Sequence, residues 1–351
     1  MSLRRAALAV PGDLQTLTGG YFYDRRLLEG LHSLGVDVAH IELPAGFPDP
    51  SPAERALAAA QLAAVAPDCA LIVDGLALGA MDRASLAAVK APLIALVHHP
   101  LADESGLDRK RRDALYRSER DVLEVAVAVI VTSPHTARAL VERYGVPSER
   151  ITVARPGVDR SPGEAQPVDP PLILSVGSTT RRKGHDVLLR ALARIADRPW
   201  QAVIVGAARD AELAQKLAQL AAELRIADRL RFAGSVSAAE LGALYRAASV
   251  FALATRHEGH GIVFDEAMVH GLPIVSCSVG AVPETVAAGA GRLVPVDDPE
   301  AFAQALHELL GDDALRETMA AASRRAGTEL PAWVETASIV AAVIDRVAAR
   351  G

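Results

Sequence analysis

Short apolar segments of strand length alternate with longer amphipathic segments along the chain, and this alternation most constrains the fold. The apolar segments are AALAV (6–10), ALIVDG (70–75), LIALVHH (93–99), VAVIVTS (127–133), LILSVGS (172–178), QAVIVGA (201–207), LRFAG (230–234), VFALAT (250–255) and LPIVSCS (272–278). Between them lie segments with helical patterning, among them residues 23–34, 53–65 and 240–248. Apolar strands that alternate with helices are typical of parallel sheets covered on both faces. The pattern predicts an α/β protein with doubly wound parallel sheets.

A proline-rich segment divides the chain. Residues 155–171, RPGVDRSPGEAQPVDPP, contain five prolines, which neither a helix interior nor a central strand accommodates. A chain of 351 residues is long enough for two domains. We therefore predict an interdomain linker there, with an N-terminal domain over residues 1–160 and a C-terminal domain over residues 161–330. Sheets of this kind bind ligands at the carboxyl ends of their strands.

Charge and composition exclude several classes of function. The net charge is −6, with 37 basic and 43 acidic residues, so a largely electrostatic nucleic-acid partner is not expected. The two cysteines, Cys69 and Cys277, lie far apart and favour a reducing cytosol over a disulfide framework. No apolar run reaches membrane-spanning length, and the start MSLRRAALAVPGD is interpreted as a strand rather than a signal peptide. We therefore expect a cytoplasmic protein.

A dinucleotide oxidoreductase is also disfavoured. Such an enzyme needs G-x-G-x-x-G directly after a strand, and the first strand is followed by PGDLQTLTGGYFYD instead. The glycines of GHG at 259–261 and GAG at 289–291 lack the third glycine of the motif.

The segment RHEGHGIVFDEAMVHGLPIVS (256–276) places two glutamates around a predicted helix start. Glu258 lies in a glycine-rich turn, and Glu266 lies inside a helix over residues 262–270, with Gly271 at its end. Unpaired N–H groups at a helix N-terminus attract anions. The arrangement predicts a phosphate there, with both carboxylates bonded to nearby hydroxyl groups. The alternative is that Glu258 caps the helix and Glu266 is solvated.

A basic turn follows the first strand of the predicted C-terminal domain. In LILSVGSTTRRKGHDVLLRAL (172–192), Arg181, Arg182 and Lys183 lie between that strand and a helix. Cations at this edge of a parallel sheet are well placed to neutralise a diphosphate. A solvated basic turn is the alternative.

The motifs and their order resemble those of the retaining glycosyltransferases of family GT4, which have the GT-B fold of two Rossmann-like domains. Glu258 and Glu266 form an E-x7-E pair within E-G-x-G-I-x-x-x-E-A-M-x-x-G-x-P-I-V, and R-K-G follows V-G. Further similar segments are TSPHTARAL (132–140), RITVARPGVD (150–159), RFAGSVSAAELGALYRAASVF (231–251) and GAVPETV (280–286). The resemblance is dense from about residue 126 to 296 and thinner before that.

The resemblance implies that the C-terminal domain binds a nucleotide-sugar donor. Arg182 and Lys183 match the basic pair on the donor diphosphate, Glu266 matches the ribose-binding carboxylate, and Glu258 matches the one that contacts the donor sugar. Ser178 stands where the family often has a further arginine, which makes Arg181 an additional candidate for that charge. His260 replaces the usual aromatic residue. Other implied donor contacts are the main chain of His260, Gly261, Ile262 and Val263 at the sugar and phosphates, and Ser235 and Val236 at the nucleobase.

The N-terminal domain carries fewer matches. Gly19 and Gly20, in a loop after the first strand, resemble the family's glycine pair at the diphosphate and acceptor, and a plain turn is the alternative. His98 and His99 end the strand at 93–99. A family histidine near this point contacts the transferred sugar, and His98 aligns better than His99. Tyr21 and His99 are further candidates for contact with the acceptor or sugar, and purely structural histidines are the alternative.

The implied activity is retaining transfer of a sugar from a nucleotide-sugar to a carbohydrate, lipid-linked or small-molecule acceptor. In the family, the departing phosphate is usually proposed to accept the acceptor's proton. Arg182, Lys183 and a helix N-terminus would stabilise the leaving diphosphate. Because no D-x-D triplet occurs, we expect no cofactor and no obligatory metal. The alternatives are another GT-B activity, such as a nucleotide-sugar epimerase, and a non-catalytic nucleotide-sugar-binding subunit of a glycan assembly complex.

Two helical segments remain. The basic stretch DRKRRDALYRSERD (108–121) is interpreted as a solvated helix, because acidic residues interleave with the basic ones. Peripheral contact with the anionic inner face of a membrane is the alternative. The resemblance implies that a helix over residues 331–351, anchored by Trp333, packs back on the N-terminal domain.

Overall fold

The computed structural model describes residues 5–160 and 163–349. Linker residues Ser161 and Pro162 and the last residue of the predicted helix at 331–351, with its neighbour Arg350, lie outside the described residues. The chain divides into two compact units: unit 1 is Met1–Gly157 with Pro331–Gly351, and unit 2 is Val158–Leu330. The division at Gly157 falls within the proline-rich segment 155–171.

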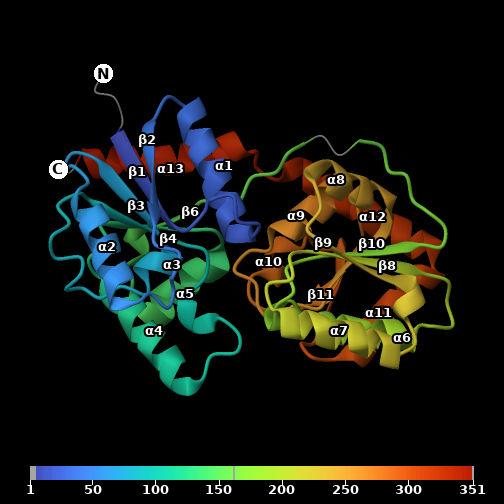
Figure 1. Ribbon diagram of the computed structural model, residues 1–351. Coiled ribbons are helices and arrows are strands. Elements are labelled where there is room, and N and C mark those ends of the chain that lie inside the picture. Colours follow the sequence, from blue (N-terminus) through green and yellow to red (C-terminus); the bar gives the residue numbers. More distant parts are fainter. Residues whose placement is uncertain (1–4, 161–162, 350–351) are drawn as a thin grey trace. The chain divides into compact units, whose positions relative to one another are not determined.

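Unit 1 contains a six-stranded parallel sheet of order β2-β1-β3-β4-β5-β6 (Figure 1). Its strands are β1 (Arg5–Pro11), β2 (Asp37–Leu43), β3 (Ala70–Asp74), β4 (Leu93–Val97), β5 (Ala128–Val131) and β6 (Ile151–Val153). Its helices are α1 (Gly19–Ser33), α2 (Pro52–Ala63), α3 (Gly75–Leu78), α4 (Arg109–Leu123), α5 (Pro134–Tyr144) and α13 (Trp333–Ala348), with short 3₁₀ turns η1 (Leu101–Asp103) and η2 (Ser148–Arg150).

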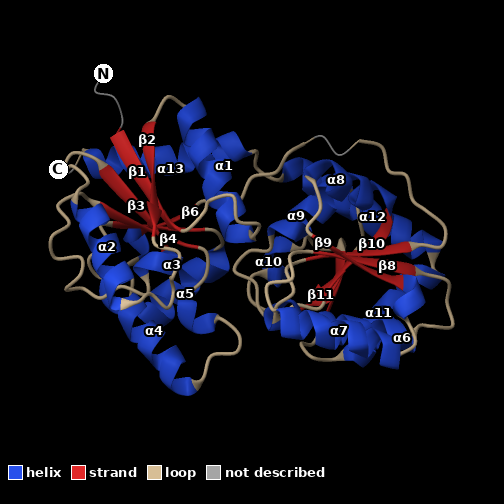
Figure 2. Ribbon diagram, in the orientation of Figure 1, coloured by secondary structure: helices blue, strands red, loops and turns tan. Residues whose placement is uncertain are grey.

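Helices cover both faces of this sheet (Figure 2). Because side chains alternate along a strand, Ala7 and Ala9 of β1 join a core that includes Leu62 of α2, Leu115 of α4 and Leu140 of α5. On α1 and α13, which pack against each other, Trp333 meets the rings of Phe22 and Tyr23 edge-on, with ring centroids 5.6 and 5.7 Å apart.

Unit 2 repeats the plan with a sheet of order β12-β11-β10-β7-β8-β9. Its strands are β7 (Leu172–Val176), β8 (Gln201–Val205), β9 (Leu230–Gly234), β10 (Ala248–Leu253), β11 (Ile274–Cys277) and β12 (Gly291–Val294). Its helices are α6 (His185–Arg194), α7 (Ala211–Glu223), α8 (Ala238–Ala247), α9 (Ile262–Val269), α10 (Val282–Thr285), α11 (Pro299–Gly311) and α12 (Asp313–Glu329), with 3₁₀ turns η3 (Arg181–Lys183) and η4 (Ala227–Arg229).

The central strand β7 sends alternate side chains into two separate cores of unit 2. Ile173 packs with residues of α6, α7 and α11, whereas Leu172 and Leu174 pack with residues of α8, α9 and α12. The predicted fold class, α/β with two doubly wound parallel sheets, is confirmed.

The sequence pattern does not predict three of the strands, namely β2, β6 and β12. All three lie at the edge of a sheet, where a strand has one neighbour and is less covered than a central strand. Polar side chains are accordingly interleaved in β2, DVAHIEL, and a run of apolar residues does not mark it.

Among the described residues, no helix has both the length and the apolar character needed to span a membrane.

Candidate functional site

The loops that follow β7 and β10 meet at the centre of unit 2. The two strands are parallel neighbours, and the strand order reverses between them, since β8 and β9 continue from β7 while β11 and β12 continue from β10. Doubly wound sheets bind ligands at the carboxyl ends of strands at such a reversal. Both glutamates and the three cations selected from the sequence lie in these loops or on the helix after β10.

Lys183 and Glu258 form a buried ion pair in these loops. The Lys183 Nζ atom donates to Glu258 Oε1 at 2.6 Å, and the two residues are only 8% and 4% exposed. Arg182 adds a second cation, with Nη1 located 3.4 Å from Glu258 Oε2 and donating to the His257 carbonyl at 3.0 Å. Three of the predicted site residues therefore form one cluster.

The charges of this cluster determine its protonation. Burial opposes ionisation of Glu258, but the Lys183 ammonium and the Arg182 guanidinium outweigh it and lower the pKa of the carboxyl to about 2. The Thr255 hydroxyl also lies 3.0 Å from Oε1. Glu258 is thus a firmly ionised, hydrogen-bonded group and is ill suited to proton transfer near neutral pH.

A glycine allows the two loops to approach. Gly184 adopts φ +63°, and a Cβ atom there would lie 1.9 Å from the carbonyl oxygen of Ala254. Arg256, which the sequence analysis missed, ties the loops together from the outside. Its backbone N–H donates to the Arg182 carbonyl at 2.7 Å, and its guanidinium donates to the Arg181 carbonyl at 2.6 Å and pairs with Asp186 at 2.8 Å.

Glu266 lies on α9, and the prediction of a helix from Ile262 that ends before Gly271 is confirmed. The Tyr245 hydroxyl donates to Glu266 Oε2 at 2.7 Å. Burial raises the pKa of Glu266 to about 7, although the Tyr245 hydrogen bond acts in the opposite direction. Among the described residues, Oε1 makes no hydrogen bond, so one carboxylate oxygen stays open to a ligand hydroxyl.

His260 occupies the turn before α9. Its Nε2 atom lies 2.5 Å from Oδ2 of the buried Asp265, and the Thr285 hydroxyl donates to its carbonyl at 2.8 Å. These bonds fix both the ring and the backbone of the turn. Asp265 directly precedes Glu266 on α9.

The remaining predicted donor contacts lie around the same sheet edge. Ser178 follows β7 and is half-buried, and Arg181 in η3 is exposed. Ser235 and Val236 follow β9, with Ser235 exposed. Gly261 is the N-cap of α9 and adopts φ +92°, and Ile262 and Val263 form the first helical turn.

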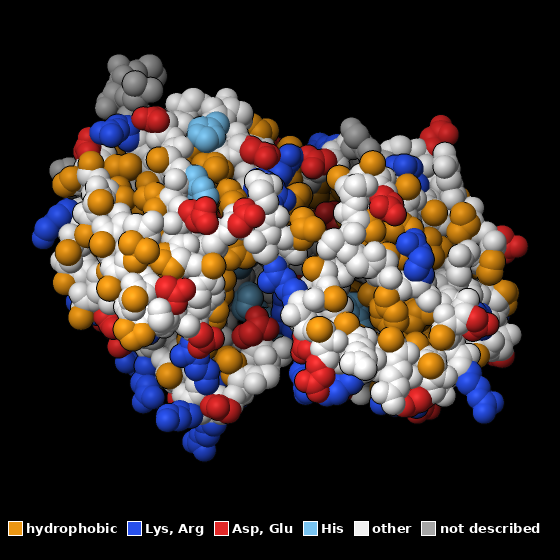
Figure 3. All heavy atoms as spheres, viewed as in Figure 1, with side chains coloured by type: hydrophobic (Ala, Val, Ile, Leu, Met, Phe, Trp, Pro, Cys, Tyr) orange, Lys and Arg blue, Asp and Glu red, His pale blue; other side chains and the backbone are white. Residues whose placement is uncertain are grey.

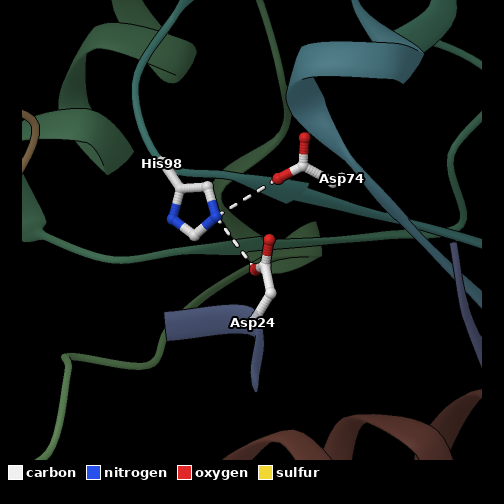
Figure 4. A group of neighbouring side chains, drawn as sticks. All are labelled: Asp24, Asp74 and His98. Carbon is white, nitrogen blue, oxygen red and sulfur yellow. Dashed lines mark hydrogen bonds and ion pairs between the residues drawn. The ribbon is translucent and has the colours of Figure 1, made fainter. Parts of the chain in front are cut away.

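In unit 1, His98 follows β4 and bonds two aspartates from other elements (Figure 4). The His98 Nε2 atom lies 3.0 Å from Asp24 Oδ1 on α1 and 3.2 Å from Asp74 Oδ2 at the end of β3. Both aspartates are buried. The sequence analysis does not select either aspartate, because neither belongs to a recognisable motif.

The surroundings of His98 are tightly specified. The Tyr23 ring packs edge-on, with centroids 5.2 Å apart, and a Cβ atom on Gly20 would lie 3.4 Å from His98 Cδ2. Burial would lower the pKa of His98, but the two carboxylates raise it well above its usual value. Asp24, Asp74 and His98 also form a group whose ligand atoms all lie within 4.8 Å of one another, compatible with a metal ion.

The predicted loop around Gly19 and Gly20 is corrected by the structure. Both glycines belong to the first turn of α1, because Thr18 caps this helix by accepting from the Tyr21 N–H at 3.3 Å. The Tyr21 hydroxyl donates to the Pro11 carbonyl at 2.6 Å. His99 bonds Glu104, with Nε2 and Oε2 3.2 Å apart.

The basic segment 108–121 forms α4, where Lys and Arg side chains gather on the surface of unit 1 (Figure 3). Arg109 is 95% exposed and lies near Asp113, and Arg111 pairs with Asp49. Leu115 and Val122 face the core. These pairs agree with a solvated helix, and membrane contact stays a prediction.

Two family models match the chain. The model described as "Glycosyl transferases group 1" matches residues 160–326, and the one described as "Glycosyltransferase Family 4" matches residues 23–161. A D-inositol 3-phosphate glycosyltransferase of Xylanimonas cellulosilytica is 34% identical over 245 residues, which are 65% of this chain and 58% of that protein. The protein of the same description from Thermobispora bispora is 36% identical, over 64% of this chain and 57% of its own. The chain therefore spans less than two thirds of these relatives.

Solved structures share the fold. A sucrose-phosphate synthase from Thermosynechococcus elongatus superposes with a TM-score of 0.83 and 23% identity, over 99% of this chain and 100% of its own. Anabaena Alr3699/HepE, in complex with UDP and glucose, gives a TM-score of 0.78 and 18% identity, over 97% of this chain and 100% of its own.

Proposed function

Because the chain belongs to the glycosyltransferases of group 1 and family 4, we propose that it transfers a sugar from a nucleotide-sugar to an acceptor hydroxyl with retention of anomeric configuration. The observation that carries the proposal is the buried cluster of Lys183, Arg182 and Glu258 at the carboxyl ends of β7 and β10. Buried cations held in place before the ligand arrives suit a reaction in which negative charge develops on a leaving group.

Lys183 and Arg182 bind the donor diphosphate in this proposal. As the bond to the anomeric carbon breaks, charge grows on the diphosphate, and cations positioned beforehand stabilise it without reorganisation. Glu258 keeps both cations oriented and binds a hydroxyl of the donor sugar. Its lowered pKa supports a binding role and argues against a role as general acid.

Glu266 binds the ribose hydroxyls. The Tyr245 hydroxyl donates to one carboxylate oxygen and fixes the rotamer of Glu266, while the other oxygen accepts from the ribose hydroxyls. The main chain from His260 to Val263, held by Asp265 and Thr285, lines the sugar and phosphates. Ser178 and Arg181 stand beside the diphosphate, and Ser235 and Val236 beside the nucleobase.

In unit 1, Gly19 and Gly20 approach the donor diphosphate and the acceptor. His98 contacts the transferred sugar, and Tyr21 and His99 contact the acceptor or the sugar. The Gly19 and Gly20 N–H groups of the first turn of α1 are available to a phosphate oxygen, as at other helix N-termini, whereas the Tyr21 N–H donates to Thr18. The departing phosphate takes the proton of the acceptor hydroxyl, so no enzymic base is required.

No obligatory divalent metal takes part in this mechanism, since Lys183 and Arg182 supply the positive charge. Transfer is expected to persist in EDTA. Strict dependence on added magnesium would contradict the proposal.

The names of related proteins suggest the first donor and the first acceptor to test. Anabaena Alr3699/HepE was solved with UDP and glucose, so UDP-glucose is the first donor to test. The curated relatives are named for D-inositol 3-phosphate, which is the first acceptor to test. Other carbohydrate, lipid-linked and small-molecule acceptors follow.

Thermal unfolding with UDP, GDP, ADP and dTDP tests the donor site directly. A ligand at about one hundred times its dissociation constant stabilises the folded chain by roughly 2.7 kcal/mol. Stabilisation by one nucleotide is expected to identify the base, and no response to any of them would contradict a nucleotide-sugar donor. Loss of transfer in a folded Glu258→Ala variant separates an enzyme from a non-catalytic subunit, and product analysis separates transfer from epimerisation.

A further inference from the structure

A single ring nitrogen of His98 faces two buried carboxylates in unit 1 (Figure 4). Nε2 lies 3.0 Å from Asp24 Oδ1 and 3.2 Å from Asp74 Oδ2, and the two aspartate side chains are 1% and 5% exposed. Ionised carboxylates at this depth need a positive partner. His98 is the charged partner that the two aspartates share, because Lys or Arg side chains make no contact with them among the described residues.

The other ring nitrogen has a different environment. Nδ1 lies on the side of the ring away from both aspartates and makes no hydrogen bond within the described residues (Figure 4). The His98 side chain remains 19% exposed. A Cβ atom on Gly20 would lie 3.4 Å from Cδ2 and 3.6 Å from Nε2, so Gly20 lies against the Nε2 edge of the ring and not against Nδ1.

Contacts hold both the ring and the backbone of His98. Tyr23 packs against it edge-on at 5.2 Å, and the hydroxyls of Thr132 and Thr136 donate to the His98 carbonyl at 3.2 and 3.4 Å. Asp74 is itself held, since its Oδ1 accepts from the Leu76 N–H at 2.7 Å. The groups that face His98 are thus Asp24 and Tyr23 from α1, Asp74 from the end of β3, and neutral threonines from the segment after β5.

We infer that Asp24 and Asp74 are positioning residues that hold His98 as an imidazolium, so that its Nδ1–H is a fixed donor to a hydroxyl oxygen of the transferred sugar. The identity of the ligand rests on the proposed function, whereas the state of the ring does not. Nε2–H is shared between the carboxylates, and both nitrogens are then protonated.

The charge of the group favours a hydroxyl over a phosphate. One imidazolium between two carboxylates carries a net charge of −1 when both are ionised. Burial raises the pKa of Asp24 to about 7, and with Asp24 protonated the group is neutral; neither state attracts a dianion. The same carboxylates make the imidazolium a weak acid. His98 therefore cannot serve as the base that deprotonates an acceptor, in line with a mechanism in which the leaving phosphate takes that proton.

Nitrogen-15 NMR of the full chain with labelled histidine tests the state of the ring. The His98 signals are assigned as those missing in His98→Gln. We expect both ring nitrogens to show imidazolium shifts at pH 7.5, and the transition to move down by about 2 pH units in an Asp24→Asn, Asp74→Asn double variant. Neutral imidazole shifts at pH 7.5 in the unsubstituted chain would overturn the inference. Asp37→Asn, at an exposed position of unit 1, is the matched control and should leave the transition unchanged.

Two further measurements address the metal and the ligand. Stoichiometric metal in the purified chain that is lost in the Asp24→Asn, Asp74→Asn variant would overturn the inference, because the three side chains would then be metal ligands. UDP-glucose, or the sugar conjugate of whichever nucleotide stabilises the chain, should shift the Nδ1 resonance, and the nucleoside diphosphate alone should not. Equal shifts with both would assign the donor bond to the diphosphate and overturn the sugar contact.

Failure of the proposed function is distinguishable from failure of this inference. A chain that binds no nucleotide and transfers no sugar contradicts the function, while the NMR transition still decides whether the aspartates hold an imidazolium. In a chain that does transfer sugar, kcat should fall in the double variant and its pH dependence should shift with the NMR transition. An unchanged pH profile would overturn the positioning role.

Discussion

Lys183 and Glu258 are 75 residues apart in the chain, yet the lysine ammonium donates to the carboxylate at 2.6 Å in the interior of unit 2. The pair joins the loops after the two central strands of the sheet. A buried ion pair is costly to form and more costly to break, because removal of one partner leaves a buried charge without compensation. Binding and stability should therefore be linked at this position.

Lys183→Ala should weaken both nucleotide binding and folding. Loss of a charge-assisted bond to the diphosphate is expected to cost roughly 1.5–3 kcal/mol of binding free energy. Glu258 would keep only Arg182, at 3.4 Å, as a cationic partner, and the free energy of unfolding should fall by up to about 3–5 kcal/mol. Calorimetric titration with the nucleotide and urea unfolding measure the two effects.

Lys216→Ala is the matched control in the same unit. Lys216 pairs with Glu212 at 2.5 Å, but both side chains are exposed, at 60% and 77%. Removal of this pair should change stability by less than about 1 kcal/mol and leave nucleotide binding unaltered. Unchanged nucleotide affinity in Lys183→Ala would remove the diphosphate assignment.

The fall of the unfolding free energy at acid pH should depend on Glu258. Its pKa is about 2 in the folded chain, below the ordinary value of 4.5 for a glutamate. Because the folded pKa is depressed, the contribution is fully present above about pH 4.5 and is lost as the pH falls toward 2. Unfolding free energies measured from pH 6 to about pH 3 should fall less steeply in Glu258→Gln than in the unsubstituted chain. Parallel curves would show that Glu258 is not the group that titrates.

Gly184→Ala should destabilise unit 2 and separate its two loops. The left-handed backbone alone costs alanine about 1–2 kcal/mol. The added Cβ atom would also lie 1.9 Å from the Ala254 carbonyl oxygen, which the loops can relieve only by moving apart. Gly234→Ala is the control, since φ there is +66° and nothing lies within 4 Å of the added atom. In Gly184→Ala, the free energy of unfolding in urea should be well below that of Gly234→Ala. Equal free energies for the two variants would argue against the close approach of Gly184 to Ala254.

Tyr245→Phe should change how nucleotide affinity depends on pH. The Tyr245 hydroxyl donates to Glu266 and lowers a pKa that burial raises to about 7. Without that bond the pKa of Glu266 rises further, so the ionised form that accepts from ribose hydroxyls is lost at a higher pH. Affinity measured calorimetrically from about pH 6 to pH 8.5 should decline earlier on acidification in the variant. Tyr116→Phe, which removes a hydroxyl bonded to the Arg143 carbonyl in unit 1, should leave the profile unchanged, and identical profiles for Tyr245→Phe would contradict the role of Glu266.

The sequence predicts those parts of the site that lie in short contiguous motifs. Glu258, Glu266, Arg182 and Lys183 are identified because a strand, a turn and a helix follow one another within about twenty residues. Tyr245, Arg256 and Asp265 act on these residues but have no motif of their own. Their roles arise from packing between elements, as when α8 brings the Tyr245 hydroxyl to Glu266 on α9.

The group around His98 shows the same limit more sharply. Asp24, Asp74 and His98 come from three elements and are brought together by the neighbouring strands β1, β3 and β4. Pairing of distant strands is a property of the whole sheet, and periodicity within a single segment does not encode it. Gly19 and Gly20 were placed in a loop for a related reason: the side chain of Thr18, rather than the helix propensity of the glycines, determines where α1 begins.

The packing of α13 against α1 has a consequence for the synthesis of the protein. Unit 1 is made of Met1–Gly157 and Pro331–Gly351, so its last helix leaves the ribosome only after every residue of unit 2 has been made. The strands of unit 1 are made first, but Trp333 does not cover Phe22 and Tyr23 until α13 has been synthesised. Unit 2, being continuous, can complete its core earlier. A stalled chain that lacks α13 should therefore expose an apolar surface on unit 1 alone, and chaperones would be expected to act on the half of the protein that is translated first.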